Sequence, residues 1–342
     1  MPNSPSATPA RSRAILTLAA LGLALTGCSS GSIGSLAPSP ASPGGIMGPP
    51  ATRSMVSNRP FGSGVHYLYS ASVGNDTVNA YQLPLTDNSI VVGSLDQFEA
   101  PTDVVANAKY MFIDDPGENT IHAYTQPITS STHKCDFGDD NILDSQALAE
   151  NGDYLYVLEG DNDLLEQFVE NAHGKPCTTS PVSTTSTGNL PLGIAVNTSF
   201  IYVSNYEDNT IDEYAQGAPF ADGELPLATL SGVSPDGGGP QVLALDSDHL
   251  YVANYAVKSS VLEYKLPLSS SSGPKLSIAL PSPCGSAPEP TGLAVDDVDS
   301  PKMLYVADDV CGMIYGYTTP LTKNQSPSVS LPASSVTGMS VF

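Results

Sequence analysis

The stretch IYVSNYEDNTIDEY, residues 201–214, has the composition of a β-hairpin. β-branched and aromatic residues fill both arms, and Asn, Glu and Asp dominate the centre, which predicts a strand, a turn and a second strand. Each arm carries one tyrosine, Tyr202 and Tyr214, 12 residues apart. This segment is one of six copies.

The six copies keep a nearly constant internal spacing. Their first aromatic residues lie at positions 69, 112, 156, 202, 251 and 305, and the second follows 12 residues later in five copies. In the remaining copy, Tyr251 and Tyr264, the spacing is 13. If each hairpin is symmetric about the midpoint of this pair, the two aromatics face each other across the strands on one side of the hairpin. The extra residue of the fifth copy then requires a bulge.

Each hairpin belongs to a four-stranded unit. A short strand precedes it, commonly opened by proline as in residues 191–196 and 290–295, and a more polar strand follows, as in residues 89–95. We call these strands A, B, C and D, where B and C form the hairpin. Four strands at a repeat of 43 to 54 residues are typical of a β-propeller blade.

The two ends of the repeat region complement each other. The first unit lacks strand A, and residues 336–342 supply an extra one, in which Thr337-Gly338 matches Thr291-Gly292. We therefore predict an all-β fold over residues 61–342, a six-bladed β-propeller with four-stranded antiparallel blades. The C-terminal strand pairs with residues 68–70 and completes the first blade. A β-sandwich or an open solenoid is the alternative, which these ends disfavour.

The N-terminal segment has the features of a secretion signal. Arg11 and Arg13 precede an apolar run over residues 14–25, which is too short to span a bilayer. The next residues, through Gly27-Cys28, resemble a bacterial lipobox, which implies a lipoprotein signal peptide over residues 1–27 and lipid attachment at Cys28. An ordinary secretory signal that happens to contain a cysteine is the alternative. Residues 28–60 are rich in Ser, Pro and Gly and predict a disordered tether.

The charge is strongly asymmetric along the chain. The first 60 residues contain all four arginines and no acidic residue, whereas the remainder holds eight lysines against 35 acidic residues, a formal net charge of −27. Such a body repels phosphates, which argues against nucleic acid as a partner. We expect a monomer that contacts the membrane through its lipid and binds an unidentified protein or glycan. Ser29 after the cysteine resembles the outer-membrane sorting pattern, so we expect an extracytoplasmic, membrane-anchored lipoprotein of the outer membrane or cell surface.

The repeat chemistry resembles a known group of propellers. The patterns Pro-x-Gly-Ile-Ala-Val, Leu-Tyr-Val-x-Asn and Asn-Thr-Ile-x-x-Tyr resemble those of NHL-like and YVTN-type β-propellers on bacterial surfaces, over residues 64–342. The resemblance implies either a non-catalytic binding or scaffold module, which we favour, or a lactonase-type hydrolase or lyase with a divalent metal in the central channel. We assign no catalytic residue.

One polar position recurs after strand B. It is occupied by Ser72, Asp115, Glu159, Asn205, Asn254 and Asp308. These side chains could form an acidic ring for Ca²⁺, or each could bind backbone N–H groups in its own B–C turn. We favour the second interpretation, because one ligand per blade is too widely spread for a single ion. We therefore predict no metal site and no cofactor, with Ca²⁺ as the alternative.

Four cysteines follow Cys28. Cys284 lies in the D–A loop that leads into the sixth blade, and Cys311 lies at the B–C turn of that blade. These two kinds of loop share one face of an antiparallel blade, so we predict a Cys284–Cys311 disulfide. Cys135 and Cys177 lie in corresponding strand-D regions of adjacent blades, and their pairing follows mainly by elimination.

Overall fold

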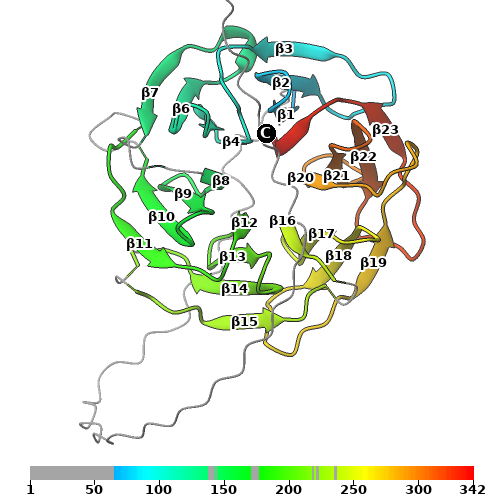
Figure 1. The fold of residues 1–342 in the computed structure, drawn as a ribbon. Helices are drawn as coiled ribbons and strands as arrows, with labels where there is room; N and C mark the ends of the chain where they lie inside the picture. The colour runs from blue at the N-terminus through cyan, green and yellow to red at the C-terminus, as the bar shows by residue number, and fades with distance from the viewer. Residues whose placement is uncertain are drawn as a thin grey trace, which may run out of the picture. The chain divides into compact units, whose positions relative to one another are not determined.

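The computed structural model describes residues 65–137, 142, 145–170, 177–217, 219–220, 223–234 and 237–342. The predicted signal peptide, Cys28 and the tether lie outside the described residues. Within these ranges, 24 strands form six four-stranded antiparallel sheets arranged in a ring (Figure 1). The predicted six-bladed propeller is therefore confirmed.

The strands follow one order in every blade, from A at the centre of the ring to D at the rim. Blade one contains β24 (Val336–Val341), β1 (Tyr67–Ser72), β2 (Thr77–Gln82) and β3 (Val91–Leu95). Blade two contains β4 (Asp103–Ala106), β5 (Tyr110–Asp115), β6 (Thr120–Thr125) and β7 (His133–Phe137). Blade three contains β8 (Ser145–Glu150), β9 (Tyr154–Glu159), β10 (Leu164–Val169) and β11 (Ser183–Ser186).

The second half of the chain repeats this order. Blade four contains β12 (Pro191–Val196), β13 (Phe200–Asn205), β14 (Thr210–Ala215) and β15 (Ala228–Ser231). Blade five contains β16 (Gly239–Leu245), β17 (His249–Tyr255), β18 (Ser260–Lys265) and β19 (Leu276–Ala279). Blade six contains β20 (Pro290–Asp296), β21 (Met303–Asp308), β22 (Met313–Thr318) and β23 (Val329–Pro332). The helix found among the described residues is a single 3₁₀ turn, Ile128–Ser130. None of the helices in this part of the chain has the length and apolar character needed to cross a membrane.

The ring closes through the two ends of the repeat region. Strand β24 pairs with β1, with Leu68 opposite Val341 and Ser70 opposite Met339. Reciprocal backbone hydrogen bonds between Tyr67 and Phe342, with N···O distances of 2.7 and 2.9 Å, extend this pairing. The predicted closure by the C-terminal strand is confirmed (Figure 1).

The register of the B–C hairpins differs from the prediction by one residue. Tyr69 lies opposite Ala80, and Tyr81 lies opposite Leu68. The two aromatics of one hairpin therefore point to opposite faces of the blade, because neighbouring positions on a strand alternate in direction. The predicted cross-strand aromatic pair is wrong in all six blades.

The cause is the length of the turn. Four residues separate the last B–C pair in five blades, so the hairpin midpoint falls between two residues instead of on one. The residue before strand C adopts positive φ in each of these turns, a conformation that Asn, Asp and Gly tolerate best; these residues are Asp76, Asn119, Asp163, Asn209 and Gly312. In blade five, five residues instead of four separate the last B–C pair, Asn254 and Ser260. The longer turn, and not a bulge, absorbs the extra residue.

The aromatic rings join neighbouring blades. Each of the six buried clusters combines the strand-B aromatic of one blade with the strand-C aromatic of the next. The pairs are Tyr69 and Tyr124, Phe112 and Phe168, Tyr156 and Tyr214, Tyr202 and Tyr264, Tyr251 and Tyr317, and Tyr305 and Tyr81. Every one of these rings is at most 6% exposed, so the hydrophobic core consists of six interfaces between blades.

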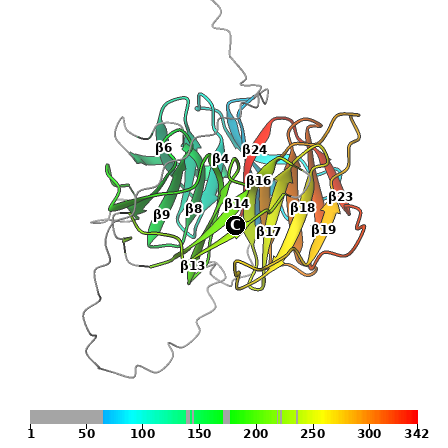
Figure 2. The ribbon, with the colours of Figure 1, turned by 60° about the horizontal axis from the view of Figure 1, so that its bottom comes forward.

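The strands run between two faces of the ring (Figure 2). Because the blades are antiparallel, the B–C turns and D–A loops lie on one face, which we call the BC face. The A–B and C–D connections lie on the opposite face, which we call the AB face. Val65, the first described residue, precedes β1 and therefore enters on the AB face.

Candidate functional sites

The polar position after strand B ties the D–A loop to its own blade. In blade two, both oxygens of Asp115 accept backbone N–H bonds, from Glu99 and Ala100, each at 2.8 Å. In blade six, Asp308 Oδ1 accepts the N–H of Glu289 at 3.0 Å and that of Cys311 at 3.3 Å. The predicted bond from the B–C turn is present at Asp308, which accepts the N–H of Cys311. The bonds from Glu99, Ala100 and Glu289 were not predicted, because these donors lie in the D–A loops that precede each blade.

Both predicted disulfides are present. Cys284 and Cys311 are joined on the BC face of blade six, with Cα atoms 5.5 Å apart. Cys135 of β7 is joined to Cys177, which precedes β11, with Cα atoms 6.0 Å apart. The second bridge therefore links the outer parts of blades two and three.

The two inner strands of blade two, β4 and β5, each carry a carboxyl group. Asp103 of β4 accepts the backbone N–H groups of Val104 and, from β8, Leu148, each at 2.8 Å. Asp114 of β5 accepts the hydroxyl groups of Thr102 and Ser145. Burial raises the pKa of Asp103 to about 7, and the charge of Asp114 adds to this effect. Asp103 is thus an inner carboxyl group that changes charge near neutral pH.

A second carboxyl pair lies between blades two and three near the AB face. The side-chain amide of Asn107 donates to Glu170 at 2.8 Å and to Glu150 at 3.4 Å. Burial raises the pKa of Glu150 to about 7. Burial together with the charge of Glu150 raises the pKa of Glu170 to about 8. Burial outweighs the hydrogen bonds from Asn107, which lower both pKa values, so the two acids are partly protonated at neutral pH.

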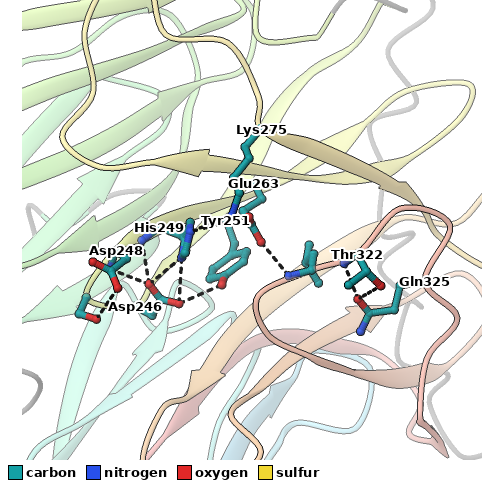
Figure 3. Close-up of polar contacts among 10 residues, drawn as sticks. Asp246, Asp248, His249, Tyr251, Glu263, Lys275, Thr322 and Gln325 are labelled. Atoms are coloured by element: carbon teal, nitrogen blue, oxygen red, sulfur yellow. Dashed lines mark hydrogen bonds and ion pairs between the residues drawn. The ribbon is translucent and has the colours of Figure 1, made fainter.

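Blade five contains a histidine–carboxylate cluster in which a lysine supplies the positive charge (Figure 3). His249 Nδ1 lies 3.3 Å from Asp246 Oδ1, and His249 Nε2 lies 3.8 Å from the fully buried Glu263. Lys275 Nζ lies 2.9 Å from the same Glu263 oxygen and 3.3 Å from His249 Nε2. Glu263 also accepts the N–H of Leu321 at 2.8 Å, which joins blade five to blade six.

Blade two contains the other histidine cluster, which the sequence did not reveal. His122 lies on β6 opposite Asp136 of β7, so their side chains share one face of the blade. Among the described residues, the two groups of three acidic or histidine side chains close enough to hold one ion both contain His122. They are Asp115, Glu118 and His122, and His122, His133 and Asp136. Neither group lies on the innermost strands, where the predicted alternative placed a divalent metal.

The BC face of blades four to six presents aromatic and apolar side chains. Tyr206 and Tyr255 lie in the B–C turns of adjacent blades, with ring centroids 6.5 Å apart. Val257 is 85% exposed and Val310 is 44% exposed, also in B–C turns. Partial burial and the charge of Asp308 raise the pKa of Asp309 close by. The sequence pattern did not predict this group, although Tyr206, Val257 and Val310 all stand in turns expected to be polar.

No protein-family model matches the chain, and no curated protein matches it in sequence. Solved structures match its fold. A functionally unknown protein from Desulfotomaculum acetoxidans is 13% identical, with a TM-score of 0.54 over 81% of this chain and 85% of its own. A protein named as a candidate 6-phosphogluconolactonase from Bacteroides fragilis is 12% identical, with a TM-score of 0.54 over 78% and 80%. A chain of a nidogen–laminin complex is 13% identical, with a TM-score of 0.54 over 81% and 98%. At this identity the likeness shows the propeller fold alone.

Proposed function

We propose that this protein is a lipid-anchored binding module of the cell envelope, which recognises a protein partner through the BC face of blades four to six. The observation that carries the proposal is the group of side chains there, the half-buried Tyr206 and Tyr255 with the exposed Val257 and Val310. Tyrosines and apolar residues surrounded by charged ones are the usual composition of a protein interface. The two disulfides are typical of an extracytoplasmic protein.

The negative charge of the BC face indicates the kind of partner that it would bind. Glu207 and Asp208 are exposed beside Tyr206, and Glu289 and Asp309 lie in the neighbouring loops of blade six. Coulomb attraction therefore favours a partner with basic residues around an apolar centre and disfavours an anionic glycan. Val65, the first described residue, lies on the opposite, AB face.

Site-specific photocrosslinking in living cells tests this proposal. A photoreactive amino acid at Val257 or Val310 should give one crosslinked species, and the same amino acid at Asn88 or Thr129, exposed on the AB face, should not. The double substitution Tyr206→Ala and Tyr255→Ala should abolish the crosslink without lowering the melting temperature by more than a few degrees. Equal crosslinking from both faces, or none from Val257 and Val310, would exclude this interface; a product sensitive to glycosidases would identify a glycan instead.

The alternative is a hydrolase of the lactonase type. The observation that favours it is Asp103, whose pKa of about 7 suits a general base on the innermost strands. A panel of neutral lactones assayed with the parent protein and with Asp103→Asn tests this candidate. Hydrolysis that disappears in the variant would support the enzyme, and no hydrolysis by the parent would leave the binding module as the only candidate.

A further inference from the structure

We propose that Asp115, Glu118 and His122 of blade two bind a divalent transition-metal ion, with Zn²⁺ as the representative cation. The three side chains come from the end of β5, from the B–C turn and from β6, so one hairpin supplies the whole set. His122 is 8% exposed, and its Nε2 atom is buried without a hydrogen-bond partner. This atom points toward the two carboxylates.

The spacing of the three groups matches that of metal ligands. His122 Nε2 lies 3.4 Å from Glu118 Oε2 and 3.8 Å from Asp115 Oδ2. Ligands about 2.0–2.2 Å from a tetrahedral ion are roughly 3.3–3.6 Å from each other, so the distance from His122 to Glu118 already fits and the distance to Asp115 is longer by only a few tenths of an ångström. Asp115 is fully buried and fixed, so a small shift of the His122 ring closes that difference, and the side chain of Glu118, which is 48% exposed, can follow it.

The other histidine group of this blade is hydrogen-bonded and supports the site from outside. His122 Nδ1 lies 2.8 Å from Asp136 Oδ1, and His133 Nε2 lies 2.7 Å from the same oxygen. Both distances are those of hydrogen bonds and are too short for two ligands of one ion. A proton on Nδ1 leaves the lone pair on Nε2, which is the arrangement that metal-binding histidines adopt when a carboxylate holds the opposite nitrogen.

In blade five, a lysine ammonium group occupies the position between a histidine and a buried carboxylate. There the histidine and the buried carboxylate have Lys275 Nζ between them, 2.9 Å from Glu263 and 3.3 Å from His249 (Figure 3). At the blade-two cluster, the ion pairs formed among the described residues involve histidine and carboxylates but no lysine. A cation from solution can take the place that the ammonium group takes in blade five.

The donor set selects the class of cation. An imidazole nitrogen with two carboxylate oxygens suits Zn²⁺ and its neighbours in the first transition series, whereas Ca²⁺ and Mg²⁺ require oxygen ligands only. Three protein ligands leave a fourth position for water or for a group of a partner.

Isothermal titration of the full-length, metal-stripped protein with Zn²⁺, in about 0.15 M salt to screen the acidic surface, tests the assignment. We expect one Zn²⁺ per chain, and Co²⁺ in its place should show the visible absorption of a four-coordinate ion. His122→Gln and Glu118→Ala should each weaken binding by more than about 100-fold. Asp136→Asn should weaken it by about 10- to 100-fold, the usual effect of losing the carboxylate behind a ligand histidine.

Two histidine variants serve as matched controls. His133→Gln and His249→Gln should bind Zn²⁺ as the parent does, because neither nitrogen faces the proposed ion. Glu118→Ala changes a half-exposed turn residue, so its melting temperature without metal should equal that of the parent. The proposal is overturned if the parent binds no stoichiometric Zn²⁺, or if His133→Gln abolishes binding while Glu118→Ala does not.

Discussion

Buried carboxyl groups give individual residues an unusual influence on stability. Asp103, Glu150 and Glu170 have pKa values raised to about 7, 7 and 8 by burial. Between their ordinary values near 4 and these raised values, the folded protein holds protons that the unfolded chain has lost. Their contribution to stability therefore falls as the pH rises through this window.

Thermal unfolding should show this pH dependence directly. The pKa of His122 is raised by Asp115 and Asp136 despite its burial, so its contribution is also lost as the pH rises. The pKa values of Asp115 and Asp136 are lowered by hydrogen bonds, and that contribution is lost in acid, below about pH 4. We expect the highest melting temperature near pH 5 and a steady decline to pH 8. Glu170→Gln, which mimics the protonated acid, should flatten the decline; a melting temperature that rises from pH 5 to 8 would contradict this assignment.

A single turn residue tests the hairpin geometry. Asn119 is exposed and has a φ of 54°, a conformation that costs most L-residues roughly 1–2 kcal/mol and glycine almost nothing. Asn119→Gly should leave the free energy of unfolding nearly unchanged or raise it, and Asn119→Ala should lower it by about 1 kcal/mol. Denaturant titration of both variants measures the difference. Equal values for the two would mean that the turn does not require positive φ.

At the scale of elements, the sequence determined the strands but not their register. The alternation around Tyr202 and Tyr214 identifies both arms of a hairpin, and the repeat length identifies the blade. The spacing of 12 does not show whether the turn holds an odd or an even number of residues, and that parity decides which face each ring takes. The informative signal was the Asn, Asp or Gly directly before strand C, as at Asn209 and Gly312, because a positive φ there closes a four-residue turn.

Double-mutant cycles distinguish the two registers. The rings of Phe137 and Phe168 lie 5.8 Å apart in an edge-to-face contact between blades two and three, whereas Tyr156 and Phe168, on one hairpin, face opposite sides. Substitution of Phe137 and Phe168 by leucine should show a coupling energy of about 0.5 kcal/mol or more. The Tyr156→Leu and Phe168→Leu pair should be additive within about 0.5 kcal/mol. Stronger coupling within the hairpin than between the blades would restore the predicted register.

The disulfide of blade six should have a measurable effect on stability. Cys284 and Cys311 are 27 residues apart, and closing a loop of this size in the unfolded chain is worth about 3 kcal/mol. Replacing both by serine should lower the melting temperature by roughly 6–12 °C, given about 2–4 °C per kcal/mol for a large domain. Peptide mapping without reduction should find the two cysteines joined in the parent. Free thiols at both positions would contradict the bridge.

At the scale of the whole molecule, the ring and its closure were predictable, but the clusters were not. Strand A missing before Tyr69 and present again near Met339 indicated a closed ring. The His122 cluster depends on the pairing of β6 with β7, where His122 lies opposite Asp136, and a separation of 14 residues does not determine that pairing. The BC-face group depends on which turns meet around the ring, which no local pattern describes.

Removal of the closing strand tests the fold as a unit. Deleting residues 335–342 leaves β1 unpaired on one edge and removes Val336 and Met339 from the interface of blades one and six. The loss should be several kcal/mol, comparable with the total margin of about 5–15 kcal/mol for a folded domain. The truncated protein should aggregate or be degraded, whereas deletion of residues 29–55 should leave the melting temperature nearly unchanged. Parent-like melting of the C-terminal truncation would show that the ring does not depend on β24.

The closure also determines how long β1 lacks its partner strand during synthesis. Strand β1 ends at Ser72 and its partner begins at Val336, so the ribosome adds roughly 260 residues between them. At about 5–20 residues per second this takes roughly 10 to 50 s, during which the first hairpin has no inner neighbour. The nascent chain therefore carries an unpaired strand edge for almost its entire elongation, and this edge is open to pairing with other chains until the last residues arrive.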